Sequence, residues 1–191
     1  MPSSATPTAF VRGMFRRFGR DRRGATAVEF ALIAPAFFAL LFAIIETAIV
    51  FFASQALETL AQDAARQVMT GQAQAAGYSA ASQLRSAAIC NDSASSVFFS
   101  CTNIFIDVES DPTSFSNINI TSPVTAGAFD ATKLNFSLGG SCSVVTVTLY
   151  YQWQLFVTGL GFNISNLSGN KRLLSATAAF RNEPYNGACA S

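Results

Sequence analysis

Residues 24–53 read GATAVEFALIAPAFFALLFAIIETAIVFFA, and this stretch decides how the chain is built. From Phe30 to Ala53 it contains one ionisable residue, Glu46. An apolar run of about 20 residues is long enough for a helix to cross the roughly 30 Å hydrocarbon core of a bilayer. We therefore predict a transmembrane helix over residues 25–53, in which Pro35 removes one backbone hydrogen bond.

The charges on the two sides of this run differ. Six arginines precede Gly24, and only Asp21 opposes them: Arg12, Arg16, Arg17, Arg20, Arg22 and Arg23. Basic residues beside a span stay in the cytoplasm, so residues 1–24 are predicted to be a cytoplasmic leader and the rest of the chain to be exported. A nucleic-acid-binding arm is the alternative for this cluster, but the adjoining apolar run explains it better, and we expect no nucleic-acid partner.

The helix is predicted to continue beyond the span, because helical spacing of apolar residues persists in a more polar segment. One face of residues 54–71 carries Leu57, Leu60, Ala61, Ala64, Ala65 and Val68. Thr70-Gly71 is a suitable C-terminal stop. The expected result is one helix of about 45 residues, half in lipid and half amphipathic.

The remaining residues, 72–191, are predicted to form a small exported domain. A short helix is expected over residues 78–89, and strands over residues 104–108, 143–153 and 172–180. The second strand shows the clearest alternation, with Val145, Val147 and Leu149 facing one way. The predicted fold class is α+β, with a long N-terminal helix followed by an antiparallel sheet.

All four cysteines lie after the span, on the side where disulfides persist. Cys90, Cys101, Cys142 and Cys189 allow three pairings, and their spacing favours Cys90–Cys101 with Cys142–Cys189. The chain has no histidine and no C-x-x-C pair, so a metal site is not expected. The exported part also lacks clustered acids, so we predict neither an enzyme nor a cofactor or small-molecule substrate, although a lone serine with a lysine stays open.

Gly24 is suited to be the residue before a cut, because it has no side chain and lets the chain extend. Cleavage there would free the amine of Ala25, four residues before Glu29. In a stack of helices each Glu29 could pair with a neighbour's amine; the alternative is an acid without a partner at a helix start. Glu46 has two interpretations as well: it reaches headgroups or water, or it is a partner charge in an assembly.

The segment from Asp21 to Pro35, with Gly24, four residues and then Glu29-Phe30, resembles the processing site of type IV prepilins and most closely that of TadE-like pseudopilins of tight-adherence (Tad) pili. Glu46, Thr70-Gly71 and the tail from Phe180 to Tyr185 are similar to that family too. TadF-like and TadG-like relatives share the resemblance, so the subtype stays open.

The resemblance implies a minor pilin of the bacterial inner membrane, with its N-terminus cytoplasmic and its C-terminal domain periplasmic. A prepilin peptidase would cut it after Gly24, and Glu29 and Glu46 would contact other Tad pilins or the assembly platform. It would then support an adhesive pilus in cell adhesion and biofilm formation, in the fibre, at its tip or at the membrane.

Two other function classes compete with this hypothesis. One is an uncleaved single-span scaffold or binding protein, and the other is a secreted protein cut after Ala56 by ordinary signal peptidase. The mass of the mature chain separates the three.

Overall fold

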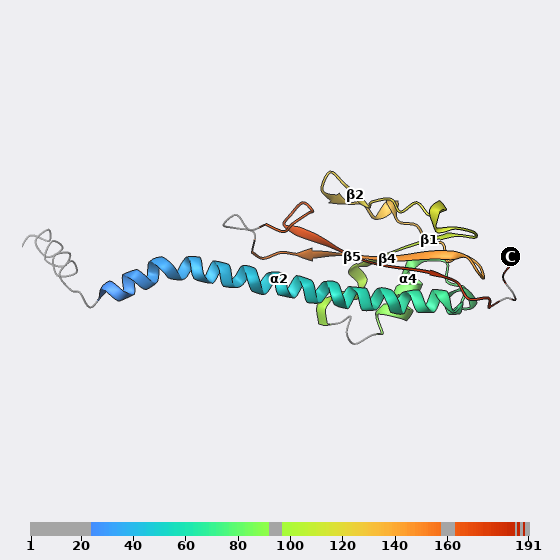
Figure 1. Cartoon of the computed structure of the whole chain (residues 1–191), viewed down its shortest axis with the longest axis horizontal. Coiled ribbons are helices and arrows are strands. Elements are labelled where there is room, and N and C mark those ends of the chain that lie inside the picture. Colours follow the sequence, from blue (N-terminus) through green and yellow to red (C-terminus); the bar gives the residue numbers. More distant parts are fainter. Residues whose placement is uncertain (1–23, 92–96, 158–162, 186, 188, 190–191) are drawn as a thin grey trace, which may run out of the picture. The chain divides into compact units, whose positions relative to one another are not determined.

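The computed structural model describes residues 24–91, 97–157, 163–185, 187 and 189 (Figure 1). The chain divides into two compact units, Met1–Ile44 and Ile45–Ser191. The second unit contains the sheet and begins inside the predicted span.

Helix α2 runs from Ala25 to Met69, 45 residues that pass through Pro35 without a break. The predicted long helix is therefore confirmed, and it ends one residue before Thr70-Gly71. Among the described residues it is the one helix long and apolar enough to cross a membrane. Its first 20 residues carry exposed large apolar side chains: Val28, Phe30, Leu32, Ile33, Phe37, Phe38, Leu40, Leu41, Phe42 and Ile44.

From Glu46 onward one face of α2 is buried. The buried stripe follows helical spacing and consists of Glu46, Val50, Ala53, Leu57, Leu60, Ala61, Ala64, Ala65 and Val68. The predicted apolar face of residues 54–71 is present, and it begins two turns earlier than the sequence indicated.

The main sheet has three antiparallel strands in the order β1-β4-β5. These strands are β1 (Ile104–Asp111), β4 (Val144–Gln154) and β5 (Lys171–Arg181). The register joins Ile104 to Tyr151 and Val144 to Arg181. The three predicted strands and the α+β class are confirmed.

Alternation along the strands gives the sheet two different faces. Ile106, Leu149 and Ala176 are cross-strand neighbours that share one buried core with Leu57 and Leu60 of α2. On the other face, the ring of Phe129 packs on Phe105 and Tyr150, with centroids 4.8 Å and 5.9 Å apart. The sheet thus lies between α2 and an excursion formed by residues 112–137, which includes β2 (Val124–Thr125) and β3 (Ala128–Phe129) (Figure 1).

Short helical turns connect these elements. The expected helix over residues 78–89 is shorter and has two parts, α4 (Ala81–Leu84) and a π-helical turn, η2 (Arg85–Ile89). The others are α3 (Gln72–Ala75) and the 3₁₀ turns η3 (Cys101–Asn103), η4 (Phe115–Asn117) and η5 (Ala131–Lys133).

Both predicted disulfides are present. Cys90–Cys101 joins the end of η2 to the turn before β1. Cys142–Cys189 joins the segment just before β4 to the C-terminal tail. The two bridges therefore hold the sheet at its entry and at its exit.

Candidate functional site

The residues of the predicted processing site lie at the beginning of α2. Gly24 immediately precedes Ala25, the first residue of the helix, and both are exposed. A Cβ placed on Gly24 would have no atom within 4 Å. Phe30 is exposed as well. Gly24 is therefore exposed where the rest of the predicted leader, which lies outside the described residues, would join the helix.

Glu29 is the fifth residue of α2 and lies on the surface of the single chain. Its predicted partner is the α-amine of Ala25, which exists only once the chain is cut. The pairing of Glu29 in an assembly therefore stays a prediction.

Glu46 makes a contact that neither sequence-based interpretation named, and its predicted role in an assembly stays a prediction. It is only 6% exposed, and its carboxylate meets the backbone of residues that follow β4. The N–H of Phe156 donates to Oε1, and the N–H of Val157 donates to both oxygens at 3.1 Å. We call Glu46, Phe156 and Val157 the Glu46 clasp. It is an intramolecular contact, separate from the assembly role predicted for this residue.

The clasp forms where the sheet ladder stops. Gln154 is the last residue of β4, and the N–H of Leu155 still finds a partner in the carbonyl of Asn170, at 2.9 Å. The N–H groups of Phe156 and Val157 lie beyond the last strand pairing, so the carboxylate of Glu46 provides acceptors that the sheet does not. Hydrogen bonds from N–H groups to a charged acceptor are roughly twice as strong as neutral ones.

A second contact, which we call the tail latch, holds the other end of the helix. The N–H of Glu183 donates to the carbonyl of Met69 at 2.9 Å, which gives one free carbonyl at the C-terminus of α2 a partner. Gly71 follows with φ +76°, and a Cβ there would lie 2.6 Å from Cδ1 of Tyr185. Glycine is thus required twice at this position, for its backbone conformation and for the space under the tyrosine ring.

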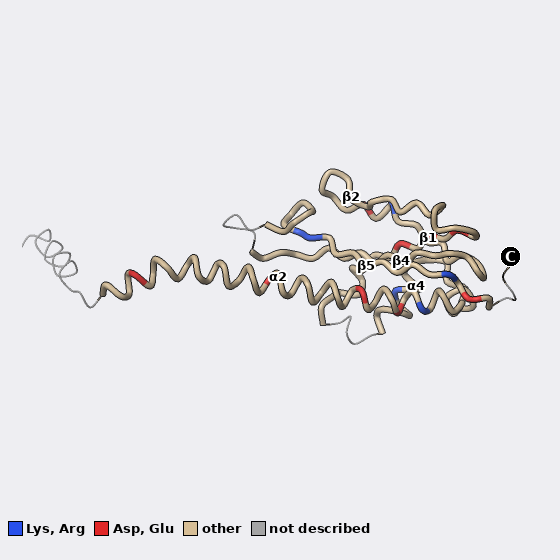
Figure 2. The backbone as a smooth tube through the Cα atoms, in the orientation of Figure 1, with Lys and Arg blue, Asp and Glu red and all other residues tan. Residues whose placement is uncertain are grey.

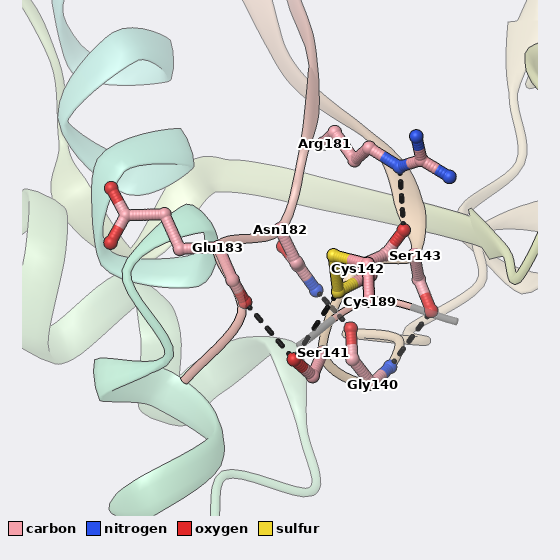
Figure 3. The surroundings of a disulfide bond; sticks show 8 residues. All are labelled: Gly140, Ser141, Cys142, Ser143, Arg181, Asn182, Glu183 and Cys189. Atoms are coloured by element: carbon pink, nitrogen blue, oxygen red, sulfur yellow. Dashed lines mark hydrogen bonds between the residues drawn. A yellow bond between two sulfur atoms is a disulfide. The ribbon is translucent and has the colours of Figure 1, made fainter. Parts of the chain in front are cut away.

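The tail latch continues to the Cys142–Cys189 disulfide (Figure 3). Asn182 is buried, and its Nδ2 donates to the carbonyls of Leu138 and Gly140 at 3.0 Å and 2.9 Å. Nε of Arg181 donates to the carbonyl of Cys142 at 2.8 Å. In Figure 3 the carboxylate of Glu183 points away from the disulfide, so its backbone and not its charge serves the latch.

The clasp and the latch hold the sheet along one helix. From Glu46 to Met69 the helix rises by about 34 Å, at 1.5 Å per residue. The 11 residues of β4 extend for about 33 Å at strand spacing. Because the two lengths match, the hairpin of β4 and β5 extends from the Glu46 clasp to the tail latch.

The polar face of the sheet contains one buried carboxylate. Asp107 is 3% exposed; burial raises its pKa, the N–H of Asn135 lowers it, and the nearby charge of Glu109 raises it. In the described part of the chain, no group of three or more His, Cys, Asp or Glu residues could hold a metal ion. Oδ1 of Asp107 accepts a hydrogen bond from the N–H of Asn135, with 2.7 Å between nitrogen and oxygen.

Comparison with protein families gives one match. The family model described as TadE-like protein matches residues 24–66. This part of the chain is similar to TadE-like proteins. The match begins at Gly24 and includes Glu29, Glu46 and most of α2. It suggests a protein that is associated with a Tad pilus and with a membrane. No curated protein and no solved structure matches the chain.

Sequence reasoning identified Glu46 and the tail, but not their contacts. The donors to Glu46 are backbone amides 110 residues further along the chain, and a backbone amide has no sequence signature. Similarly, nothing in the sequence of Phe180 to Tyr185 indicated that this segment meets the end of α2. The sequence features that could have indicated this contact are Gly71 directly after the helix and Tyr185 in the tail.

Proposed function

We propose that this chain is a minor, prepilin-like subunit of a Tad-type pilus, cut after Gly24 by a prepilin peptidase. One observation carries the proposal: the TadE-like match and α2 begin together at the residues where the cut is predicted, and Gly24 is exposed there. A peptidase held at the membrane surface needs an accessible bond next to a small residue, and this junction provides both.

The domain that follows α2 supports a minor role over that of a bulk subunit. It has its own sheet, core and two disulfides, and it is much larger than the short extension expected of a major Tad pilin. We infer that the leader stays in the cytoplasm, that the domain is exported across the inner membrane, and that the mature chain joins other pilins or the assembly platform. No catalytic role is part of this proposal.

The cut can be tested by the intact mass of the full chain expressed with a cognate prepilin peptidase. We expect a mature N-terminus at Ala25, and Gly24→Arg should keep the leader attached. A Cβ at Gly24 meets no other atom, so this substitution leaves the fold intact. Gly19→Arg adds the same charge within the leader and should still be cut.

The same measurement can contradict the proposal. A chain that keeps its leader in the presence of active peptidase would be an uncleaved membrane anchor. A mature chain that begins at Leu57 would be a product of ordinary signal peptidase. Cleavage of Gly24→Arg at the normal position would remove Gly24 from the processing site.

Assembly is tested separately with Glu29→Gln, which keeps the size of the side chain and removes its charge. When one partner of a buried ion pair is removed, the loss is about 3–5 kcal/mol, so pili and co-purified pilins should be lost while cleavage and folding persist. Glu58→Gln is the matched control, because Glu58 is an exposed glutamate in the same helix. Normal piliation by the Glu29 variant would show that this carboxylate is not an assembly contact.

A further inference from the structure

Phe156 is an exposed aromatic residue beside a buried charge. It is 85% exposed, the highest value among the large apolar residues that the structure describes, although its N–H is held by Glu46. The neighbouring Leu155 is buried, so the chain has turned the phenylalanine outward at the end of β4. One exposed apolar side chain is common on a protein surface, so the apolar residues at the same height on α2 decide whether Phe156 belongs to a larger apolar surface.

The position of this loop along α2 identifies the surface. The helix surface outside the buried stripe stays apolar beyond Glu46, with Ile49, Phe51 and Phe52 exposed by 42%, 67% and 67%. Phe52 lies six residues beyond Glu46, which is about 9 Å along the helix. Lipid that covers Phe52 on one side of the helix would therefore also reach the loop that contains Phe156.

The charges near the loop match a lipid headgroup. Lys171 and Arg172 pair with Gln154 and Trp153, two to three residues before Phe156 on the neighbouring strand. At strand spacing this is about 7–10 Å from Phe156, the distance that separates acyl chains from headgroup phosphates. The hairpin from Val144 to Arg181 has three basic residues and no acidic one, and Figure 2 shows a basic stretch at the beginning of β5.

We propose that this end of the β4–β5 hairpin binds the surface of the bilayer that α2 crosses. Phe156 enters the boundary between acyl chains and headgroups, and Lys171 and Arg172 bind anionic phosphates. The Glu46 clasp sets the depth of the loop and gives the carboxylate hydrogen-bond donors where water is scarce. The proposal requires α2 to be a membrane anchor, and it does not depend on cleavage or on pilus assembly.

Photocrosslinking of the full chain in vesicles tests the contact. The photoreactive residue p-benzoylphenylalanine replaces Phe156, and in a control chain it replaces Phe115, which is exposed in η4 just after the far end of β1. The vesicles contain phosphatidylglycerol and phosphatidylcholine in equal amounts, or phosphatidylcholine alone. Products are identified by mass, and intact disulfides report the fold.

We expect lipid adducts at position 156 and none at position 115. Lys171→Gln with Arg172→Gln should lower the adduct yield in the anionic vesicles to the level in phosphatidylcholine, while Lys133→Gln should leave it unchanged. Adducts to a second polypeptide would instead identify a protein-binding face and overturn the proposal. Absence of adducts at 156, or equal yields at 156 and 115, would overturn it as well.

Discussion

Replacing Glu46 with glutamine should release the end of the β4–β5 hairpin from α2 while the rest of the domain stays folded. The native carboxylate accepts from the N–H of Phe156 and from that of Val157. Glutamine keeps one acceptor oxygen and places an amide NH₂ where the second oxygen was. With its oxygen at the Oε1 position, glutamine can still accept from both N–H groups, but its NH₂ then faces the N–H of Val157 where Oε2 had accepted, and both hydrogen bonds lose their charge assistance.

The size of the effect follows from these contacts. A hydrogen bond to a charged group contributes about 1.5–3 kcal/mol, against about 1 kcal/mol for a neutral one. Loss of the charge assistance in both bonds amounts to about 2 kcal/mol, or roughly a 30-fold change in a local opening equilibrium. The core between Leu57, Leu60 and the sheet is unaffected, so the change is local and not global.

Native-state hydrogen exchange measures this opening directly, because the two amides are themselves the donors. In the full chain in bilayer nanodiscs, exchange at Phe156 and Val157 should rise about 30-fold in Glu46→Gln, with little change in the middle of β4. Glu58→Gln is the control, since within the described residues its exposed carboxylate accepts from the side chain of Gln55, at 3.4 Å, and meets no backbone amide of the hairpin. Unchanged exchange at the two amides, or an equal increase in the control, would refute the role of the clasp.

Three further outcomes are expected in urea unfolding of the same chain. Gly71→Ala should lower the free energy of unfolding more than Gly77→Ala does. Both glycines have positive φ, which costs another residue about 1–2 kcal/mol, but only at Gly71 would the new Cβ also lie 2.6 Å from a tyrosine ring. Equal losses would contradict the tail latch. Removal of Cys142–Cys189 by double serine substitution should cost about 4 kcal/mol, against about 3 kcal/mol for Cys90–Cys101, because the closed loop is longer; the reverse order would contradict this reason. Burial raises the pKa of Asp107, so its charged form destabilises the fold increasingly as pH rises above the unfolded pKa of 3.8. Asp107→Asn should therefore gain stability relative to the native chain as the pH rises from the unfolded pKa of 3.8 to the higher folded pKa, and a constant difference would show that the carboxylate is not penalised.

Much of the fold could be predicted, because its strongest sequence signals are periodic or continuous. The apolar run and the stripe at Leu57, Leu60 and Val68 predicted α2, and the alternation around Val145 and Val147 predicted β4. The spacing of the cysteines favoured the pairing that is present. Strands of two residues, such as β2 and β3, are too short to show any period, and the excursion that carries them was not foreseen.

The border between lipid and domain was harder to predict for a physical reason. Val50 and Ala53 are buried against protein, yet in sequence they cannot be distinguished from residues that face acyl chains. Burial in a core and burial in a bilayer select the same side chains. The polar residue Glu46 is the one marker of the change, and its partner could be named only once the backbone of Phe156 was placed.

The Glu46 clasp and the tail latch together explain how a single acidic residue in an apolar helix can fix the position of the whole domain along that helix. A helix packed through an apolar stripe still presents apolar side chains to the sheet after a slide of one turn, about 5.4 Å, so polarity alone does not set its register. Here a slide would separate Glu46 from the loop amides at one end and Met69 from Glu183 at the other. Because β4 spans the distance between the two contacts, neither can re-form without breaking the other. The domain is therefore fixed in register along α2, and the depth at which its hairpin end meets the bilayer follows from that register.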